Sequence, residues 1–190
     1  GEKRPKVQLG TATTATARIN AANVTVRGVV FEANVDTLAV MLNVAAKDAV
    51  IEDCEFRELS AKQALIYVDL NGGAANAVDR FVVRRCKVVS IAVGANSGIK
   101  LSEVAAEGAV EDCWINGDWA DAGIHNPTGK VLTHLLLNGN VIANLQTGDH
   151  AVELVSAITG MAVDNRLYAD TLGTIFDPGS LKCVGNFETD

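Results

Sequence analysis

The 190-residue sequence has few aromatic residues, no long apolar run and a shortage of basic side chains. Aromatic residues make up 5% of the chain, and 16 Lys and Arg stand against 23 Asp and Glu, so the formal net charge is −7. Because nucleic-acid backbones are bound by basic stripes, no nucleic-acid partner is expected. No apolar stretch reaches the roughly 18 residues that a membrane-spanning helix needs, so no membrane span is expected either.

The four cysteines also lack the spacing of metal ligands. Cys54, Cys86, Cys113 and Cys183 show no CxxC or CxxH pair, whereas a structural zinc site needs four converging ligands. The first three recur at one position of the repeat described next. This indicates small buried thiols, since free Cys behaves as a small apolar residue.

What the sequence does contain is a six-residue phrase that returns seven times. Its copies are VRGVVF from Val26, IEDCEF from Ile51, VRRCKV from Val83, VEDCWI from Val110, LNGNVI from Leu137, VDNRLY from Val163 and VGNFET from Val184. One small or amide residue anchors each copy: Val29, Cys54, Cys86, Cys113, Asn140, Asn165 and Asn186. The anchors lie 21 to 32 residues apart. This period predicts a solenoid, in which each repeat buries its apolar face by stacking on its neighbours.

Each repeat has the pattern of three short strands. In segment 79–90, apolar and polar residues alternate on both sides of a corner at Arg85, which is the period-two pattern of strands. A third strand follows a variable loop, at 40–42, 66–68, 99–101, 124–126, 152–154 and 175–177. These runs are too short and too β-branched for helices. We therefore predict an all-β, single-stranded right-handed parallel β-helix of about seven rungs, with three short strands per rung.

We expect one domain over 1–190, with a first rung in 1–22 and repeat rungs in 23–190. No amphipathic helix caps the start, although an exposed rung is an aggregation-prone sheet edge. We therefore expect either a longer natural solenoid or a partner chain that covers the end.

The repeat also predicts which residues stack on one another. Charges alternate at the first corner position, through Arg27, Glu52, Arg84, Glu111, Asn138 and Asp164, and at the next, through Asp53, Arg85 and Asp112. Opposite charges on adjacent strands stabilise by up to about 1 kcal/mol per pair. The three anchoring Asn residues should hydrogen-bond one another and the bend, because a buried unpaired amide is costly. The expected core columns run from Val24, Val26, Val29 and Phe31 through Leu137, Asn140 and Ile142 to Val163, Asn165 and Leu167.

The phrase V/I-x-x-C/N-x-F/I, with its Cys or Asn ladder at a tight bend, resembles the pectate-lyase-like right-handed β-helix superfamily over roughly residues 17–190. That superfamily includes polysaccharide lyases, glycoside hydrolases, phage tailspikes and fibres, and non-enzymatic surface proteins. The resemblance implies a substrate groove along the outer face near the third strand. Alternation predicts that Met41, Tyr67, Lys100, His125, Glu153 and Phe176 point outward there.

Candidate chemistry follows from this face. We predict Lys100, His125 and Glu153 as catalytic residues, and Asp121 and Asp149 as Ca²⁺ ligands, because neighbouring carboxylates repel unless a cation or proton intervenes. A lyase would abstract a proton from an acidic sugar with Lys100 or His125. A hydrolase would pair Asp121 or Asp149 with Glu153. Apart from Ca²⁺, no cofactor is expected.

A second hypothesis involves no catalytic site. Apolar residues are expected at several outward positions, namely Val30, Trp114, Leu136, Met41, Tyr67 and Phe176, and such a stripe favours lateral packing into a closed homo-oligomer, here a homotrimer. The preferred prediction is thus a structural or receptor- or glycan-binding β-helix module of phage-tail or surface-protein type, located on a virion or at the cell surface. The alternative is a polysaccharide-cleaving enzyme.

Overall fold

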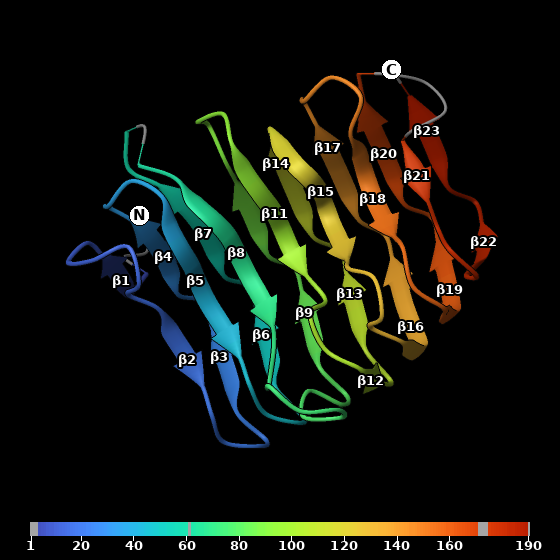
Figure 1. The fold of residues 1–190 in the computed structure, drawn as a ribbon, viewed down its shortest axis with the longest axis horizontal. Coiled ribbons are helices and arrows are strands. Elements are labelled where there is room, and N and C mark those ends of the chain that lie inside the picture. The colour runs from blue at the N-terminus through green and yellow to red at the C-terminus, as the bar shows by residue number, and fades with distance from the viewer. Residues whose placement is uncertain (1–3, 61, 171–174, 190) are drawn as a thin grey trace.

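The computed structural model describes residues 4–60, 62–170 and 175–189. Its strands wind into a parallel solenoid of about seven turns, with the two termini at opposite ends of the stack (Figure 1). Each complete turn places one strand in each of three sheets, and no helix occurs among the described residues. The predicted all-β parallel β-helix with three short strands per rung is confirmed. A helix that could cross a membrane is therefore absent from this part of the chain.

Three parallel sheets form the walls of the solenoid. Sheet A contains β1 (Lys6–Leu9), β4 (Val30–Ala33), β7 (Glu55–Glu58), β10 (Lys87–Val89), β14 (Trp114–Gly117), β17 (Val141–Asn144), β20 (Arg166–Ala169) and β23 (Phe187–Thr189). Sheet B contains β2 (Ala17–Ile19), β5 (Leu38–Val44), β8 (Ala64–Leu70), β11 (Ala95–Lys100), β15 (Trp119–Asn126), β18 (His150–Leu154) and β21 (Phe176–Asp177). Sheet C contains β3 (Thr25–Arg27), β6 (Val50–Glu52), β9 (Val82–Arg84), β13 (Ala109–Glu111), β16 (Leu132–Asn138), β19 (Ile158–Val163) and β22 (Lys182–Val184), and β12 (Ala105–Ala106) pairs with β16.

A left-handed residue turns each rung from sheet C into sheet A. Seven stacked positions have φ between 50° and 68°: Gly28, Asp53, Arg85, Asp112, Gly139, Asp164 and Gly185. This backbone region suits Gly and is tolerated by Asp, whereas Arg rarely adopts it. The corner predicted from the repeat is therefore one backbone conformation that recurs along the whole stack.

The structure corrects the start of the last two copies of the repeat. Ala162 pairs with Leu137, and Cys183 pairs with Ala162. The buried column consequently passes through Ala162, and Val163 lies in the corner column beside Asn138, where the sequence predicts Asp164. The error arose because these copies have one residue fewer between their first apolar letter and the anchoring Asn. The other predicted core positions are buried or packed against the core.

The inside of the corner is a ladder of thiols followed by a ladder of amides. Asn140 Nδ2 donates to Asn165 Oδ1 over 2.9 Å, and Asn165 Nδ2 donates to Asn186 Oδ1 over 2.9 Å. The backbone N–H of Cys113 donates to Asn140 Oδ1 over 3.0 Å, which joins the two ladders. The predicted mutual hydrogen bonding of the three amides is confirmed.

The outside of the corner carries the predicted charge ladder in its N-terminal half. Glu52 lies between Arg27 and Arg84, with N–O distances of 3.7 and 2.7 Å. Asp53 lies between Arg27 and Arg85, at 3.0 and 2.9 Å. These pairs join three successive rungs at the solvent-facing edge.

Sheet B departs from simple alternation and overturns three predictions. Met41 and Tyr67 are fully buried, and Phe176 lies in the inward column with Val152. The physical reason is that two consecutive residues of the β5 and β8 strands face the core, as Met41 and Leu42 do. In β5, β8 and β21 the outward-facing residue therefore lies one or two positions later in the sequence than simple alternation predicts.

Candidate functional site

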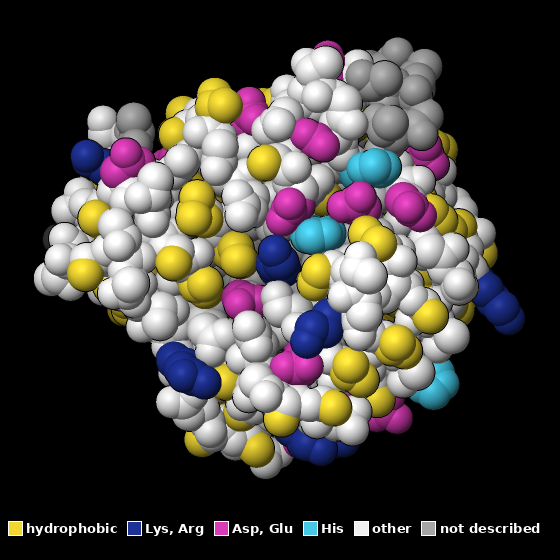
Figure 2. Space-filling view, in the orientation of Figure 1, with side chains coloured by type: hydrophobic (Ala, Val, Ile, Leu, Met, Phe, Trp, Pro, Cys, Tyr) yellow, Lys and Arg dark blue, Asp and Glu magenta, His cyan; other side chains and the backbone are white. Residues whose placement is uncertain are grey.

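A file of polar side chains runs along the outer face of sheet B, one from each strand. Strand register places its members side by side in the order Arg18, Asn43, Asp69, Lys100, His125, Glu153 and Asp177. We call this the polar file. Neighbouring members are separated by the spacing of parallel strands, about 4.8 Å. Figure 2 shows acidic, Lys and His side chains gathered on this face of the molecule.

The middle of the polar file is a connected cluster that contains all three predicted catalytic residues. Lys100 Nζ lies 3.4 Å from Asp121 Oδ2. The His125 imidazole lies between two carboxylates, with Nδ1 3.2 Å from Asp121 Oδ2 and Nε2 3.4 Å from Glu153 Oε2. Lys100, Asp121, His125 and Glu153 thus form one group; the sequence predicted one outward column for Lys100, His125 and Glu153 but not the inclusion of Asp121, and the catalytic role of these residues stays a prediction.

A bulge in β15 brings Asp121 into this group. Ala95 pairs with Trp119 and Ser97 pairs with Ala122, so β15 has one more residue than β11 across the same interval. Bulges of this kind redirect a side chain without ending the strand. Here Asp121 meets the hydroxyl of Ser97, which donates to Oδ2 over 3.2 Å.

Asp121 is held as a carboxylate by its neighbours. The pKa of Asp121 is lowered to about 2, mainly by the His125 imidazole and also by Lys100 and Ser97, against the opposing effect of burial. Nδ1 of His125 is buried and makes no hydrogen bond to the described residues, although Asp121 Oδ2 lies 3.2 Å away. The cluster can therefore stabilise positive charge or accept hydrogen bonds.

Asp149 lies at the other end of the cluster, before β18. Its pKa is raised chiefly by burial, and Asp121 and Asp118 raise it further, while His150 opposes them. His150 Nδ1 lies 3.9 Å from Glu153 Oε1. This end of the cluster is consequently rich in carboxylates.

The predicted Ca²⁺ site does not fit this arrangement well. No group of three or more His, Cys, Asp or Glu side chains suited to a metal ion occurs among residues 4–60, 62–170 and 175–189. The oxygen of Asp121 that would bind calcium already faces Lys100 and His125. A cation would compete with these basic groups, so no step is assigned to calcium here.

The sequence did not single out the N-terminal part of the polar file. A hollow of about 320 Å³ lies there, lined by Thr16, Arg18, Val40, Asn43, Asp69, Asn71 and Gly73. Asp69 is 5% exposed, and burial raises its pKa. Asn71 Nδ2 donates to Asp69 Oδ2 over 3.4 Å, and Asn43 Nδ2 donates to the Asn71 carbonyl over 3.1 Å. The sequence did contain a sign of this hollow, namely a polar residue two positions after each of Met41 and Tyr67.

The fold and this face define a parallel β-helix with a polar outer file. No protein-family model matches the chain, and no curated protein matches it. Two solved structures of trypsin-treated variants of QnrB1, a plasmid-mediated fluoroquinolone resistance protein, are similar to it. One has 13% identity and a TM-score of 0.29 and covers 93% of this chain and 91% of that one. The other has 11% identity and a TM-score of 0.31, with 99% and 92% covered. At these values the similarity carries no argument about function.

Proposed function

We propose that the chain is a glycan-binding β-helix module of the structural or surface-protein type, and that the polar file is its binding face. The supporting observation is the continuity of the file: every strand of sheet B contributes one polar side chain to it. A linear glycan offers hydroxyl groups at a regular repeat, and the file offers hydrogen-bonding partners at a regular spacing of about 4.8 Å.

The charges of the cluster favour a neutral glycan over the acidic one that a lyase would act on. Asp118, Asp121, Asp149 and Glu153 outnumber the single permanent cation, Lys100. Like charges that cannot pair oppose binding of an acidic sugar, whereas a sugar hydroxyl can accept a hydrogen bond from Lys100 and donate one to a carboxylate. The hollow at Asp69 supplies a second set of amide and carboxyl groups for hydroxyl recognition.

Cleavage of the glycan is the second candidate, and one observation favours it. His125 lies between two carboxylates, which orient its imidazole and can each accept a proton from it. The different environments of Asp121 and Asp149, which lower one pKa and raise the other, are typical of acid–base pairs. In this version Glu153 and His125 would move a proton at the glycosidic oxygen.

One experiment addresses both candidates. Immobilised neutral, amino-bearing and acidic polysaccharides are presented to the chain, and bound protein and newly released reducing ends are both measured. The Lys100→Met variant should bind about tenfold to a hundredfold more weakly, since a hydrogen bond to a charged group contributes about 1.5–3 kcal/mol. Lys182→Met is the matched control, because Lys182 is an exposed lysine on sheet C.

The outcomes separate clearly. Binding without release of ends, weakened by Lys100→Met and unchanged by Lys182→Met, supports the binding module. Release of ends that Glu153→Gln abolishes supports cleavage. Equal loss in both lysine variants, or no binding to any class, contradicts the proposed face.

A further inference from the structure

The outer face of sheet A is a second surface, independent of the polar file. The column of this face that carries Trp114 contains Lys6, Val30, Glu55, Lys87, Trp114, Val141, Arg166 and Phe187, in strand order. Trp114, Val141 and Phe187 are 40%, 39% and 65% exposed. Of the apolar stripe predicted from sequence, Val30, Met41 and Tyr67 are buried, whereas Trp114 is exposed on this face. Trp, Tyr and Arg are the residues that most often anchor protein interfaces.

We propose that this face binds a second copy of the same chain in a two-fold dimer centred on Trp114. In a two-fold interface whose axis runs parallel to the strands, a residue two strands before the central strand meets the residue two strands after it. Strand β14 carries Trp114, and β7 and β20 lie two strands to either side of it in sheet A. If a second copy binds in this way, the residues on β7 must complement those on β20.

The two strands are complementary in charge. Glu55 of β7 would face Arg166 of β20 in the second copy, and the reverse contact would form at the same time. Arg166 is exposed and has no ion-pair partner among the described residues, while Glu55 is paired only with Arg57 of its own strand, at 3.2 Å. Two new ion pairs, symmetric about Trp114, would follow from one arrangement.

The neighbouring column has the same symmetry. Arg57 of β7 would face Tyr168 of β20, which places a guanidinium against an aromatic ring. One strand from the centre, Lys87 would face Val141, and its aliphatic stem can cover an apolar residue while the ammonium group stays in water. Opposite residues thus match at both distances from the centre.

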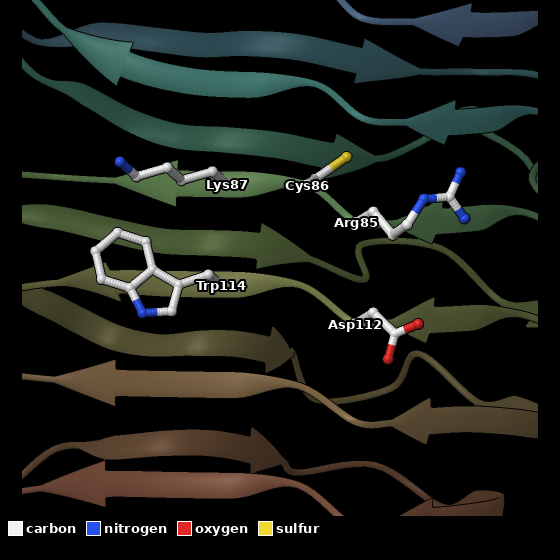
Figure 3. Close-up of a pocket in the computed structure, with 5 residues that line it drawn as sticks. All are labelled: Arg85, Cys86, Lys87, Asp112 and Trp114. Carbon is white, nitrogen blue, oxygen red and sulfur yellow. The ribbon is translucent and has the colours of Figure 1, made fainter.

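The surface beside Trp114 has a shallow, open depression. A groove of about 440 Å³ is lined by Arg85, Cys86, Lys87, Asp112 and Trp114 (Figure 3). Lys87 and Trp114 lie side by side on neighbouring strands, and the ammonium group is 5.0 Å from the centre of the ring (Figure 3). Each copy therefore offers both an exposed indole and a groove next to it.

The test is a charge exchange between two variants. We expect the unmodified chain to be a dimer by light scattering coupled to gel filtration, and Glu55→Lys and Arg166→Glu each to shift it to monomer. Mixing the two variants should restore a dimer that contains one copy of each. In that dimer the introduced lysine of one copy faces the introduced glutamate of the other, while the unchanged Arg166 faces the unchanged Glu55. Native mass spectrometry distinguishes this mixed dimer from both homodimers.

A matched control and a fold check complete the experiment. Met161→Lys changes an equally exposed apolar residue, 43% exposed, on sheet C, and should leave the dimer intact. Circular dichroism of each variant verifies that it is folded before mixing, and formation of the mixed dimer is itself evidence of folding. A monomeric or trimeric unmodified chain, or variants that fold but form no mixed dimer, would overturn the proposal.

Discussion

The column inside the corner has an N-terminal half of cysteines and a C-terminal half of asparagines. Side chains in both halves hydrogen-bond a backbone carbonyl of the preceding rung. In the N-terminal half, the Sγ of Cys86 donates to the Ile51 carbonyl of the preceding rung over 3.6 Å. In the C-terminal half, Asn165 Nδ2 donates to the equivalent carbonyl, that of Leu137, over 3.0 Å. Thiols are weak donors, whereas amides both donate and accept strongly. The amide half therefore has the stronger interior ladder.

On the outside of the corner, by contrast, the N-terminal half has the stronger contacts. The N-terminal half pairs Glu52 and Asp53 with arginines of the neighbouring rungs. In the C-terminal half the corner residue after Asp112 is Gly139, and no ion pair of Asp112 occurs among the described residues. We infer that the ion pairs outside the corner add stability to the N-terminal half, where the thiol contacts inside are weak. In the C-terminal half the amide ladder makes such ion pairs unnecessary.

The largest expected effect comes from removing one member of each interior ladder. Asn165→Ala leaves the N–H of Asn140 and the Leu137 carbonyl without the side chain that satisfies them. Each buried unsatisfied group costs about 1–3 kcal/mol, so a loss of about 3–5 kcal/mol is expected. Cys86→Ala should cost only about 1 kcal/mol, because it removes little more than the volume of one methylene. Urea unfolding of both variants measures the difference, and equal losses would show that the two ladders are equivalent.

A smaller effect is expected at two glycines of the same column. Gly28 and Gly139 have φ of 68° and 64°, so an alanine at either position has the strain of a left-handed residue, about 1–2 kcal/mol. At Gly139 the added Cβ would also lie 2.5 Å from Asp112 Oδ1, whereas at Gly28 it would meet nothing within 4 Å. Gly139→Ala should therefore destabilise more than Gly28→Ala.

A double-mutant cycle identifies the reason for that difference. Adding Asp112→Gly to Gly139→Ala removes the carboxylate that the new Cβ would meet. The extra loss at Gly139 should then disappear in thermal unfolding, because contacting residues are not additive. An unchanged loss would mean that the backbone alone, and not the Asp112 contact, sets the cost.

The sequence predicted those parts of the molecule where one residue type recurs in register. The corner column, with its thiols, amides and alternating charges, could be read because each rung repeats the same short phrase. The group formed by Lys100, His125 and Glu153 was also predicted, because regular strands place outward residues of successive rungs together. These predictions required only period and register.

The rest depended on local irregularities that a period does not contain. Asp121 reaches Lys100 through a bulge in β15, and Met41 is buried because two consecutive residues of β5 face the core. The core also holds Trp119 where Gly117 leaves space: a Cβ there would lie 2.6 Å from the indole. Such fits are set by packing between distant rungs, so alternation along one strand cannot reveal them.

The smallest expected effect concerns the exterior charges, and it depends on pH. Arg84 lowers the pKa of Glu52, and Arg85 lowers that of Asp53. A carboxyl whose pKa is lower in the folded state stabilises the fold above its unfolded pKa, and this contribution is lost as the pH falls through the folded pKa. Arg85→Gln should therefore flatten the decline of stability below about pH 4, where unfolded carboxyls begin to bind protons.

Arg18→Gln provides the matched control, since Arg18 is exposed on β2 and forms no ion pair with the described residues. Melting temperatures across the acid range should separate the two variants at low salt, and the separation should shrink at high salt because exposed charges are screened. If both variants decline in parallel with the unmodified chain, the corner charges do not stabilise the N-terminal half, and its thiol ladder suffices without them.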